Sequence, residues 1–246
     1  MTVFLVGGGA DTVTRGLLAP FLAEAGAAAE RAGRRARVAI AVVDHWRSGR
    51  RLLPAYVHAL DGRRDLDVQP LFLRRGKDLA PTAFDAVDGI VVGGGSTPTY
   101  LDALIGSAGS IGSRVRSGTP YLGFSAGAMI APRTALVGGH RRAGRDICPE
   151  EWSEDLDEIT VCPGLGLVGF PVDVHTAQAG TLGRTVALVE SGTATAVGID
   201  EDTCLAVADP DADPADGVVT GRGGVWFVRR SNGTTEISRR TAGAAR

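Results

Sequence analysis

The chain has 246 residues, of which 44% are hydrophobic and 22% charged, and its formal net charge is -2. This balance is typical of a globular α/β protein, without the basic excess of nucleic-acid-binding proteins. Its apolar runs are far shorter than the roughly 20 residues of a membrane-spanning helix. Residues 1–6 form a strand-like run without the cationic start of a secretory signal. We therefore expect a cytoplasmic protein that binds neither nucleic acid nor membranes.

The three cysteines, Cys148, Cys162 and Cys204, are far apart and lack Cys-x-x-Cys spacing. An odd number at such spacing argues against a disulfide framework and against a zinc site. We expect reduced structural cysteines, and the sequence indicates no metal and no cofactor.

Apolar runs alternate with helix-forming segments through the first half of the chain. Strands are predicted at 3–6, 37–43, 67–73, 89–92 and 121–124, and helices at 14–31, 50–60, 82–87 and 99–117. The last helix is weakened at Gly106 and Gly109. This alternation implies a three-layer, doubly wound α/β fold with a mostly parallel sheet, and ligands bind such sheets at the carboxyl ends of the strands.

The C-terminal part follows a different pattern. A polar loop at 209–217 precedes short apolar runs at 218–220 and 224–228, which predict an antiparallel hairpin, with 235–238 pairing alongside. We expect a single α/β domain over 1–240 and a frayed tail over 241–246.

The run Gly7-Gly8-Gly9 follows the first predicted strand, as a dinucleotide-binding loop would. The fingerprint Gly-x-Gly-x-x-Gly is not met, because position 12 is Thr12. A tight turn near the ligand-binding edge is the better interpretation, and we expect no nucleotide there.

Ser125 stands where a predicted strand turns into a helix, in Gly123-Phe124-Ser125-Ala126-Gly127. A nucleophile on such a turn has a strained backbone, and the residues two before and two after it must be small. The N–H of Ala126 would then lie on the same side as the hydroxyl, where it can bind an oxyanion.

A second oxyanion donor is expected from the loop Gly93-Gly94-Gly95, which follows a neighbouring strand and has no side chains to block its N–H groups. Either loop alone is weak evidence in a chain with 35 glycines. Together they favour nucleophilic catalysis, which also needs a base and an orienting acid.

His175 is the predicted base among the four histidines. It ends the apolar run Phe170-Pro171-Val172-Asp173-Val174 and should reach the same edge as Ser125. A buried histidine with a local hydrogen bond is the competing interpretation. We expect polar surface roles for His45 and His58, and an exposed position for His140.

Several motifs occur in an order that resembles the serine peptidase family of aspartyl dipeptidase (dipeptidase E) and cyanophycinase. They are Val92-Gly93-Gly94-Gly95-Ser96-Thr97, Gly123-Phe124-Ser125-Ala126-Gly127-Ala128, Gly164-Leu165-Gly166-Leu167 ahead of Asp173-Val174-His175, and Gly198-Ile199-Asp200-Glu201-Asp202-Thr203. The resemblance implies a class I glutamine-amidotransferase-like fold and cleavage of peptide bonds next to aspartate.

The resemblance also implies roles for individual residues. Ser125 matches the nucleophile, His175 the base, and the N–H groups of Gly94 or Gly95 and of Ala126 the oxyanion donors. The acid falls on Asp146, with Glu150 and Glu151 as competitors in an acidic stretch that is otherwise expected to be a solvated face. The remaining substrate-binding positions are Thr97, Asp173 and Arg184.

Two departures concern the substrate. Cyanophycinase-like sequences carry Gln before the histidine, Arg four residues after it and Gln in the glycine loop, where this chain has Val174, Ala179 and Thr97. These differences argue against cyanophycin as the substrate. The insertion at 138–160 contains Trp152 and many acids, so it is a candidate lid or pocket wall whose carboxylates would select a basic or amine-bearing ligand.

The sequence thus predicts a serine peptidase or amidohydrolase acting on a small peptide or amide, with an aspartyl dipeptide or an isoaspartyl bond as candidates. An esterase of the α/β-hydrolase type and a non-catalytic small-molecule-binding module on the same fold are the alternatives. The oligomeric state is open, with a homodimer as one option.

Overall fold

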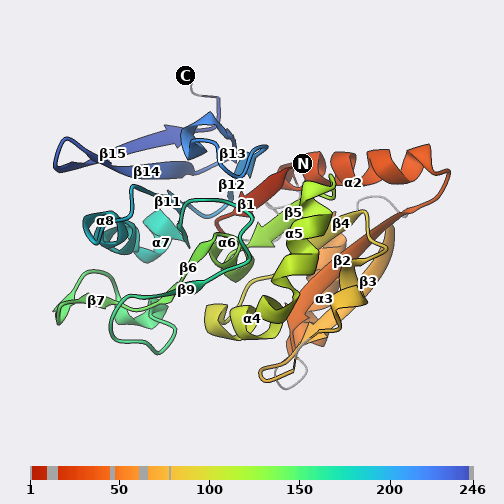
Figure 1. Ribbon diagram of the computed structural model, residues 1–246, viewed down its shortest axis with the longest axis horizontal. Helices are drawn as coiled ribbons and strands as arrows, with labels where there is room; N and C mark the ends of the chain where they lie inside the picture. Colours follow the sequence, from red (N-terminus) through yellow and green to blue (C-terminus); the bar gives the residue numbers. More distant parts are fainter. Residues whose placement is uncertain (1, 10–15, 45–47, 61–65, 78, 244–246) are drawn as a thin grey trace.

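The computed structural model describes residues 2–9, 16–44, 48–60, 66–77 and 79–243, and a seven-stranded sheet lies at its centre (Figure 1). The strand order is β13-β12-β1-β5-β4-β2-β3. These strands are β1 (Val3–Val6), β2 (Ala36–Val43), β3 (Leu66–Leu73), β4 (Gly89–Val92), β5 (Tyr121–Phe124), β12 (Thr203–Val207) and β13 (Val218–Gly221). The neighbouring strands β1, β5, β4, β2 and β3 run parallel to one another. At the β1 edge, β12 pairs antiparallel with β1, and β13 pairs antiparallel with β12. This confirms the predicted, mostly parallel sheet.

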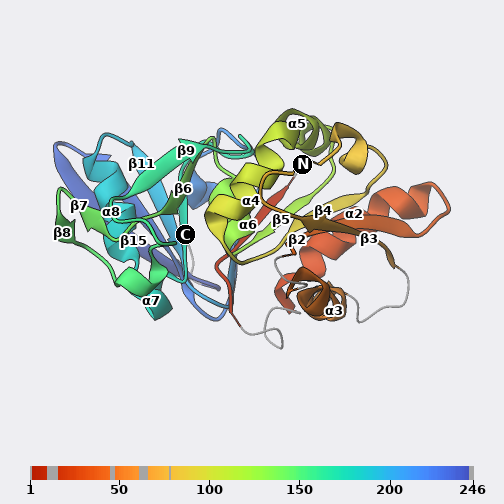
Figure 2. The same ribbon diagram turned by 90° about the horizontal axis from the view of Figure 1, so that it is seen from below.

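Helices cover both faces of this sheet, which gives the three predicted layers (Figure 2). One face packs against α2 (Ala19–Arg31) and α3 (Ser48–Leu60), and the other against α4 (Thr97–Leu104) and α5 (Ala108–Arg116). The predicted weak point of the last helix is real, because a 3-10 turn at Ile105–Ser107 separates α4 from α5. The segment predicted as a helix at 82–87 is only a 3-10 turn, Pro81–Phe84. The first residues of the helix predicted at 14–31 lie outside the described part.

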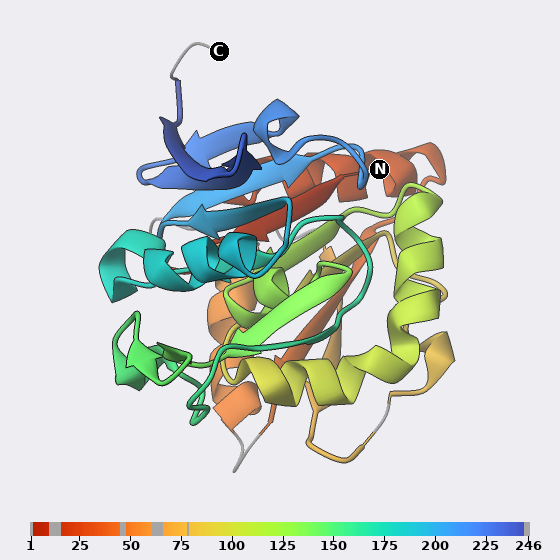
Figure 3. The same ribbon diagram turned by 60° about the vertical axis from the view of Figure 1, so that its left-hand side comes forward.

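A second sheet has the order β10-β11-β14-β15 and packs beside the first (Figure 3). Its elements are β10 (Val172–Val174), β11 (Thr195–Ile199), β14 (Gly224–Ser231) and β15 (Thr234–Thr241), with α7 (Thr176–Ala179) and α8 (Leu182–Glu190) between β10 and β11. The C-terminal antiparallel hairpin is β14 with β15. The hairpin predicted between 218–220 and 224–228 is wrong, because β13 pairs with β12 in the other sheet. Thr241 belongs to β15, and 244–246 lie outside the described residues.

The segment after the serine turn forms small, separate elements. They are α6 (Ala126–Ile130), β6 (Thr134–Gly138), β7 (Arg141–Arg142), β8 (Arg145–Asp146), a 3-10 turn at Glu150–Trp152 and β9 (Thr160–Pro163), with a further 3-10 turn at Pro214–Asp216. β6 pairs with β9 and β7 with β8. The insertion at 138–160 therefore folds back on itself, and we call this segment the flap. In the part of the chain that the structure describes, no helix is long and apolar enough to cross a bilayer.

Candidate active site

Ser125 sits on the sharp turn that the sequence predicts. Its backbone has φ 52° and ψ -111°, and its N–H donates to the carbonyl of Val6 at 2.9 Å. A Cβ at Gly123 would lie 2.4 Å from the carbonyl oxygen of Gly127, and one at Gly127 would lie 2.2 Å from that of Val92. The small residues therefore let the strand and the helix pass, and the strained turn holds the hydroxyl out of the sheet.

The glycine loop lies directly against Ser125, since a Cβ at Gly94 would be 3.1 Å from that of the serine. Two tyrosines hold the loop in place. The N–H of Gly94 donates to the Tyr56 hydroxyl at 2.7 Å, and the Tyr100 hydroxyl donates to the Gly94 carbonyl at 3.1 Å. Burial raises the pKa of Tyr100 well above its usual value, so this phenol stays a neutral donor.

These bonds separate the two candidate oxyanion donors of the loop. The Gly94 N–H is already used by Tyr56. The N–H groups of Gly95 and Ala126 have no partner among the described residues. The sequence left Gly94 and Gly95 as alternatives, and the geometry favours Gly95.

His175 meets Ser125 at the start of a hydrogen-bonded chain. The serine Oγ is 2.9 Å from the imidazole Nε2, and the imidazole Nδ1 is 2.7 Å from Oε1 of Glu201. His175 also has a left-handed backbone, with φ 54° and ψ 29°, and its N–H donates to the Gly7 carbonyl at 3.0 Å. A neutral imidazole bonded in this way has one nitrogen to accept the serine proton and one to hold the carboxylate.

The carboxylate at His175 is therefore Glu201, and the prediction of Asp146 is not supported. Asp146 is exposed and bonds the Arg141 guanidinium at 2.7 Å. That hydrogen bond and the charge of Arg141 hold the pKa of Asp146 below its usual range. The competitors Glu150 and Glu151 are exposed residues of the 3-10 turn before Ser153. The flap holds Asp146, Glu150 and Glu151 away from Nδ1 of His175, and that nitrogen is already hydrogen-bonded to Glu201.

Glu201 is held by the turn that leads from β11 into β12. Its N–H donates to Oε1 of Gln178, at 2.9 Å. The preceding Asp200 is buried and accepts four hydrogen bonds, from Ala177 N, Gly224 N, Trp226 Nε1 and an Arg239 Nη2. The motif Gly198-Ile199-Asp200-Glu201-Asp202-Thr203 was the sequence signal for this turn, but the predicted acid lay between Ser125 and His175 in the chain.

Three residues expected to bind substrate instead bond protein groups. Thr97 is 1% exposed and donates from both its N–H and its hydroxyl to Oε1 of Glu154, each at 2.8 Å. Asp173 and Arg184 are buried and bond each other through two contacts, at 2.6 and 2.9 Å. Each of these side chains therefore already has partners within the protein, and a direct contact with substrate stays a prediction.

Gly8 packs edge-on against the His175 ring. A Cβ at this position would lie 2.1 Å from the imidazole Cε1, and the residue has φ +99°. The run Gly7-Gly8-Gly9 thus lies near the site as predicted, but its described residues form no hydrogen-bonded turn. Its lack of side chains makes room for the imidazole.

Gly8→Ala should lower kcat about 100-fold, because the added methyl group must displace the imidazole from Ser125. Gly118→Ala is the matched control: its φ is +103°, but a Cβ there has no atom within 4 Å. Steady-state rates and melting temperatures of both variants test this. Equal rate losses in both would mean that backbone strain, and not the contact with His175, is responsible.

The other histidines lie away from this chain of contacts. His140, expected to be exposed, is only 3% exposed, because the flap folds over it with backbone bonds to Asp157 and Ile147. His58 is exposed on α3, and His45 lies outside the described residues. Within the described ranges, no three His, Cys, Asp or Glu side chains gather as a metal site would require.

A cavity of about 770 Å³ opens beside the glycine loop. Its wall includes Gly94, Gly95 and Ser96 of the loop, together with Arg74 and Arg75. Asp44 also lines it, but its buried carboxylate is already paired with Arg50 and Arg74, at 3.5 and 3.4 Å. The described charges around this cavity therefore favour an anionic ligand.

Comparison with known proteins shows to which family the chain belongs. The model of peptidase family S51 matches residues 63–214. The chain belongs to peptidase family S51. It is thus a serine-type peptidase of the group that includes dipeptidase E and cyanophycinase.

Solved structures show the same fold. A peptidase from an acI-B1 Actinobacterium superposes with a TM-score of 0.67 at 18% identity, covering 99% of this chain and 95% of that chain. A Listeria monocytogenes EGD-e protein described as peptidase E gives a TM-score of 0.50 at 18% identity, covering 98% of both chains. A search of curated proteins gave no match.

Proposed function

We propose that this S51 peptidase hydrolyses an amide bond of a small acidic peptide with Ser125 as nucleophile, His175 as base and Glu201 as orienting acid. The observation that carries the proposal is the unbroken chain of contacts, 2.9 Å from Oγ to Nε2 and 2.7 Å from Nδ1 to Oε1. Distances of this size are those that nucleophilic catalysis requires.

The reaction follows from the roles of these groups. Ser125 Oγ attacks the scissile carbonyl carbon while its proton passes to Nε2 of His175. The oxyanion that forms accepts hydrogen bonds from the N–H groups of Gly95 and Ala126. His175 then returns the proton to the leaving amine, and a water molecule, activated by the same imidazole, hydrolyses the acyl-enzyme ester. Glu201 stabilises the imidazolium in both halves of the reaction.

A serine-directed fluorophosphonate tests the nucleophile without knowledge of the substrate. Intact-mass and peptide analysis should find the label on Ser125. A mass-spectrometric screen of α- and β-aspartyl dipeptides and of other amides then identifies the scissile bond. A chain that takes up no label and cleaves none of these compounds would refute the proposed function.

The substrate class rests on the cavity next to Gly95. A peptide whose carbonyl lies on Ser125 can extend a nearby carboxylate toward Arg75, and guanidinium groups bind carboxylates through paired hydrogen bonds. We therefore propose aspartyl substrates, in agreement with the dipeptidase side of the family. The acidic residues of the insertion, expected to select a basic ligand, line a separate hollow around Trp152.

Arg75→Gln should raise KM for an aspartyl dipeptide about tenfold and leave kcat nearly unchanged, because a charge-assisted hydrogen bond at a half-open site is lost. The asparaginyl analogue is the matched substrate control, since it has no carboxylate to lose. Arg31→Gln, on the exposed end of α2, is the control variant. If Arg75→Gln raises KM equally for both substrates, Arg75 does not bind the carboxylate of the aspartyl substrate.

A further inference from the structure

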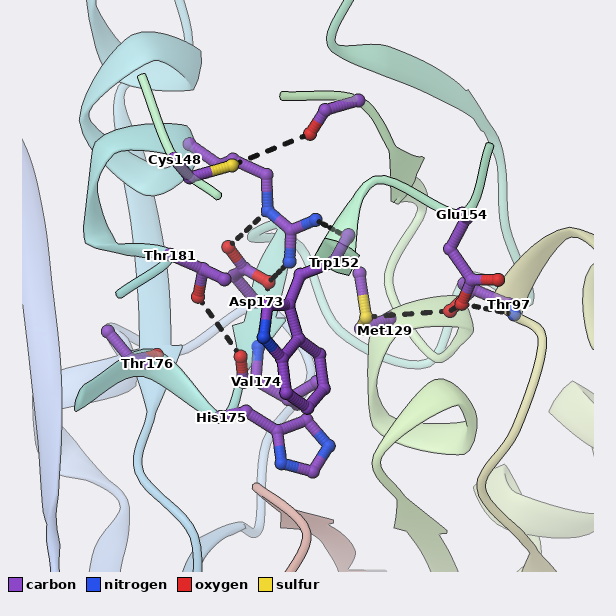
Figure 4. A network of polar contacts seen from close by, with 12 residues as sticks. Thr97, Met129, Cys148, Trp152, Glu154, Asp173, Val174, His175, Thr176 and Thr181 are labelled. Carbon is purple, nitrogen blue, oxygen red and sulfur yellow. Dashed lines mark hydrogen bonds and ion pairs between the residues drawn. The ribbon is translucent and has the colours of Figure 1, made fainter. Parts of the chain in front are cut away.

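The indole of Trp152 lies over the ring of His175. Their ring centroids are 5.0 Å apart and the planes are tilted by 34°, and Figure 4 shows the indole above the imidazole. Trp152 comes from the flap, not from either large sheet. It is 38% exposed, so burial alone does not explain why the ring stays there.

The backbone of Trp152 is held by a buried ion pair. Arg184 donates from Nη1 to the Trp152 carbonyl at 2.6 Å, and from Nε and Nη2 to Asp173 at 2.9 and 2.6 Å. The side chains of Arg184 and Asp173 are 3% and 0% exposed. A buried ion pair is tolerated only when further hydrogen bonds satisfy it. One of those bonds fixes the residue that covers His175.

The flap is held a second time two residues later. Glu154 accepts hydrogen bonds from the N–H and hydroxyl of Thr97, at the start of α4 and directly after the glycine loop. Glu154 has φ +59°, a conformation that a glutamate adopts only when its surroundings impose it. The short segment 152–154 thus spans from the histidine to the glycine loop, with a buried partner at each end.

We propose that Trp152 is a positioning residue for His175, and that the Asp173–Arg184 pair supports it. This inference rests on the proposed function. The in-plane partners of the imidazole, Ser125 and Glu201, leave its faces uncovered. A stacked indole restricts rotation of the ring and keeps water from that face. The π system also stabilises the imidazolium that forms when Ser125 loses its proton, because a cation within about 6 Å of an indole is attracted to it.

Phosphonylation by a fluorophosphonate measures this role without a substrate. The Ser125 Oγ–P bond forms, the P–F bond breaks, fluoride leaves and the hydroxyl proton passes to His175 Nε2. Trp152→Ala should lower the maximal rate of labelling about 10- to 100-fold, as small misplacements of reacting groups do, while the inhibitor concentration for half-maximal rate stays the same. Trp152→Phe keeps an aromatic face and should recover most of the rate.

Two further variants separate positioning from packing. Trp152→Leu keeps apolar bulk without an aromatic face and should label as slowly as Trp152→Ala, which also covers the case in which the alanine variant fails to fold. Ile237→Ala removes a side chain that is 48% exposed on β15 and should label at the wild-type rate. Melting temperatures confirm that each variant is folded.

The outcomes distinguish this inference from the function on which it rests. Labelling of folded Trp152→Ala or Trp152→Leu at the wild-type rate would overturn the positioning role and leave the proposed function intact. The same holds if Trp152→Phe is as slow as the alanine variant. A wild-type chain that does not react at all would overturn the proposed function, and the role of Trp152 with it.

Discussion

Ser125→Ala is expected to abolish peptide hydrolysis while the fold persists. The substitution removes the only atom that bonds the acyl group, and in another serine peptidase loss of the nucleophile costs about 10⁶ in kcat. The backbone at this position has φ 52°, which alanine adopts as reluctantly as serine, so the melting temperature should change little. Turnover of an aspartyl dipeptide, followed by release of the amine, measures the loss.

Ser117→Ala is the matched control. Its exposed hydroxyl donates to the carbonyl of Ser113 in α5. This variant should hydrolyse the substrate at the wild-type rate. Hydrolysis by Ser125→Ala at a similar rate, in a preparation shown by active-site titration to be free of a contaminating peptidase, would contradict the mechanism.

Glu201→Gln should lower kcat by about 10⁴, the loss that follows when the carboxylate of a serine triad becomes an amide. The amide keeps the size of the side chain but does not stabilise the imidazolium, and its NH₂ group favours the wrong imidazole tautomer. KM should change much less than kcat, because Glu201 touches the imidazole and not the proposed cavity. Steady-state kinetics separates the two constants.

Asp146→Asn tests whether Asp146 or Glu201 is the acid that orients His175. It breaks an exposed bond to Arg141 and should leave kcat close to that of the wild type. Glu150→Gln should behave in the same way. A large loss in either variant, together with a mild effect of Glu201→Gln, would reverse the assignment of the acid.

Local chemistry in the sequence was enough to predict the nucleophile turn and the main sheet. The strands 89–92 and 121–124 are continuous apolar runs, and their bounds agree with β4 and β5. The need for small residues on both sides of Ser125 follows from sterics within five residues, and the contacts at Gly123 and Gly127 confirm it. These two features, which depend on near neighbours in the chain, were therefore predicted correctly.

Features that depend on long-range packing were not predicted correctly from the sequence. Glu201 is 26 residues from His175, and the two meet because β10 and β11 pair in parallel and end side by side. Asp146 was favoured for its place between serine and histidine in the chain, but the pairing of β7 with β8 directs it to Arg141. His140 was misjudged for the same reason, because a polar sequence does not reveal that a flap covers it.

The reacting side chains belong to different sheets. Ser125 follows β5 of the seven-stranded sheet, His175 follows β10 of the four-stranded sheet, and Glu201 lies in the link from β11 to β12. Catalytic competence is therefore a property of how the two sheets dock. A small shift of one sheet relative to the other would separate the Ser125 Oγ from the His175 Nε2, although the hydrogen bonds between the strands of each sheet would be kept. On warming, this peptidase should lose its catalytic activity at a lower temperature than that at which its secondary structure unfolds.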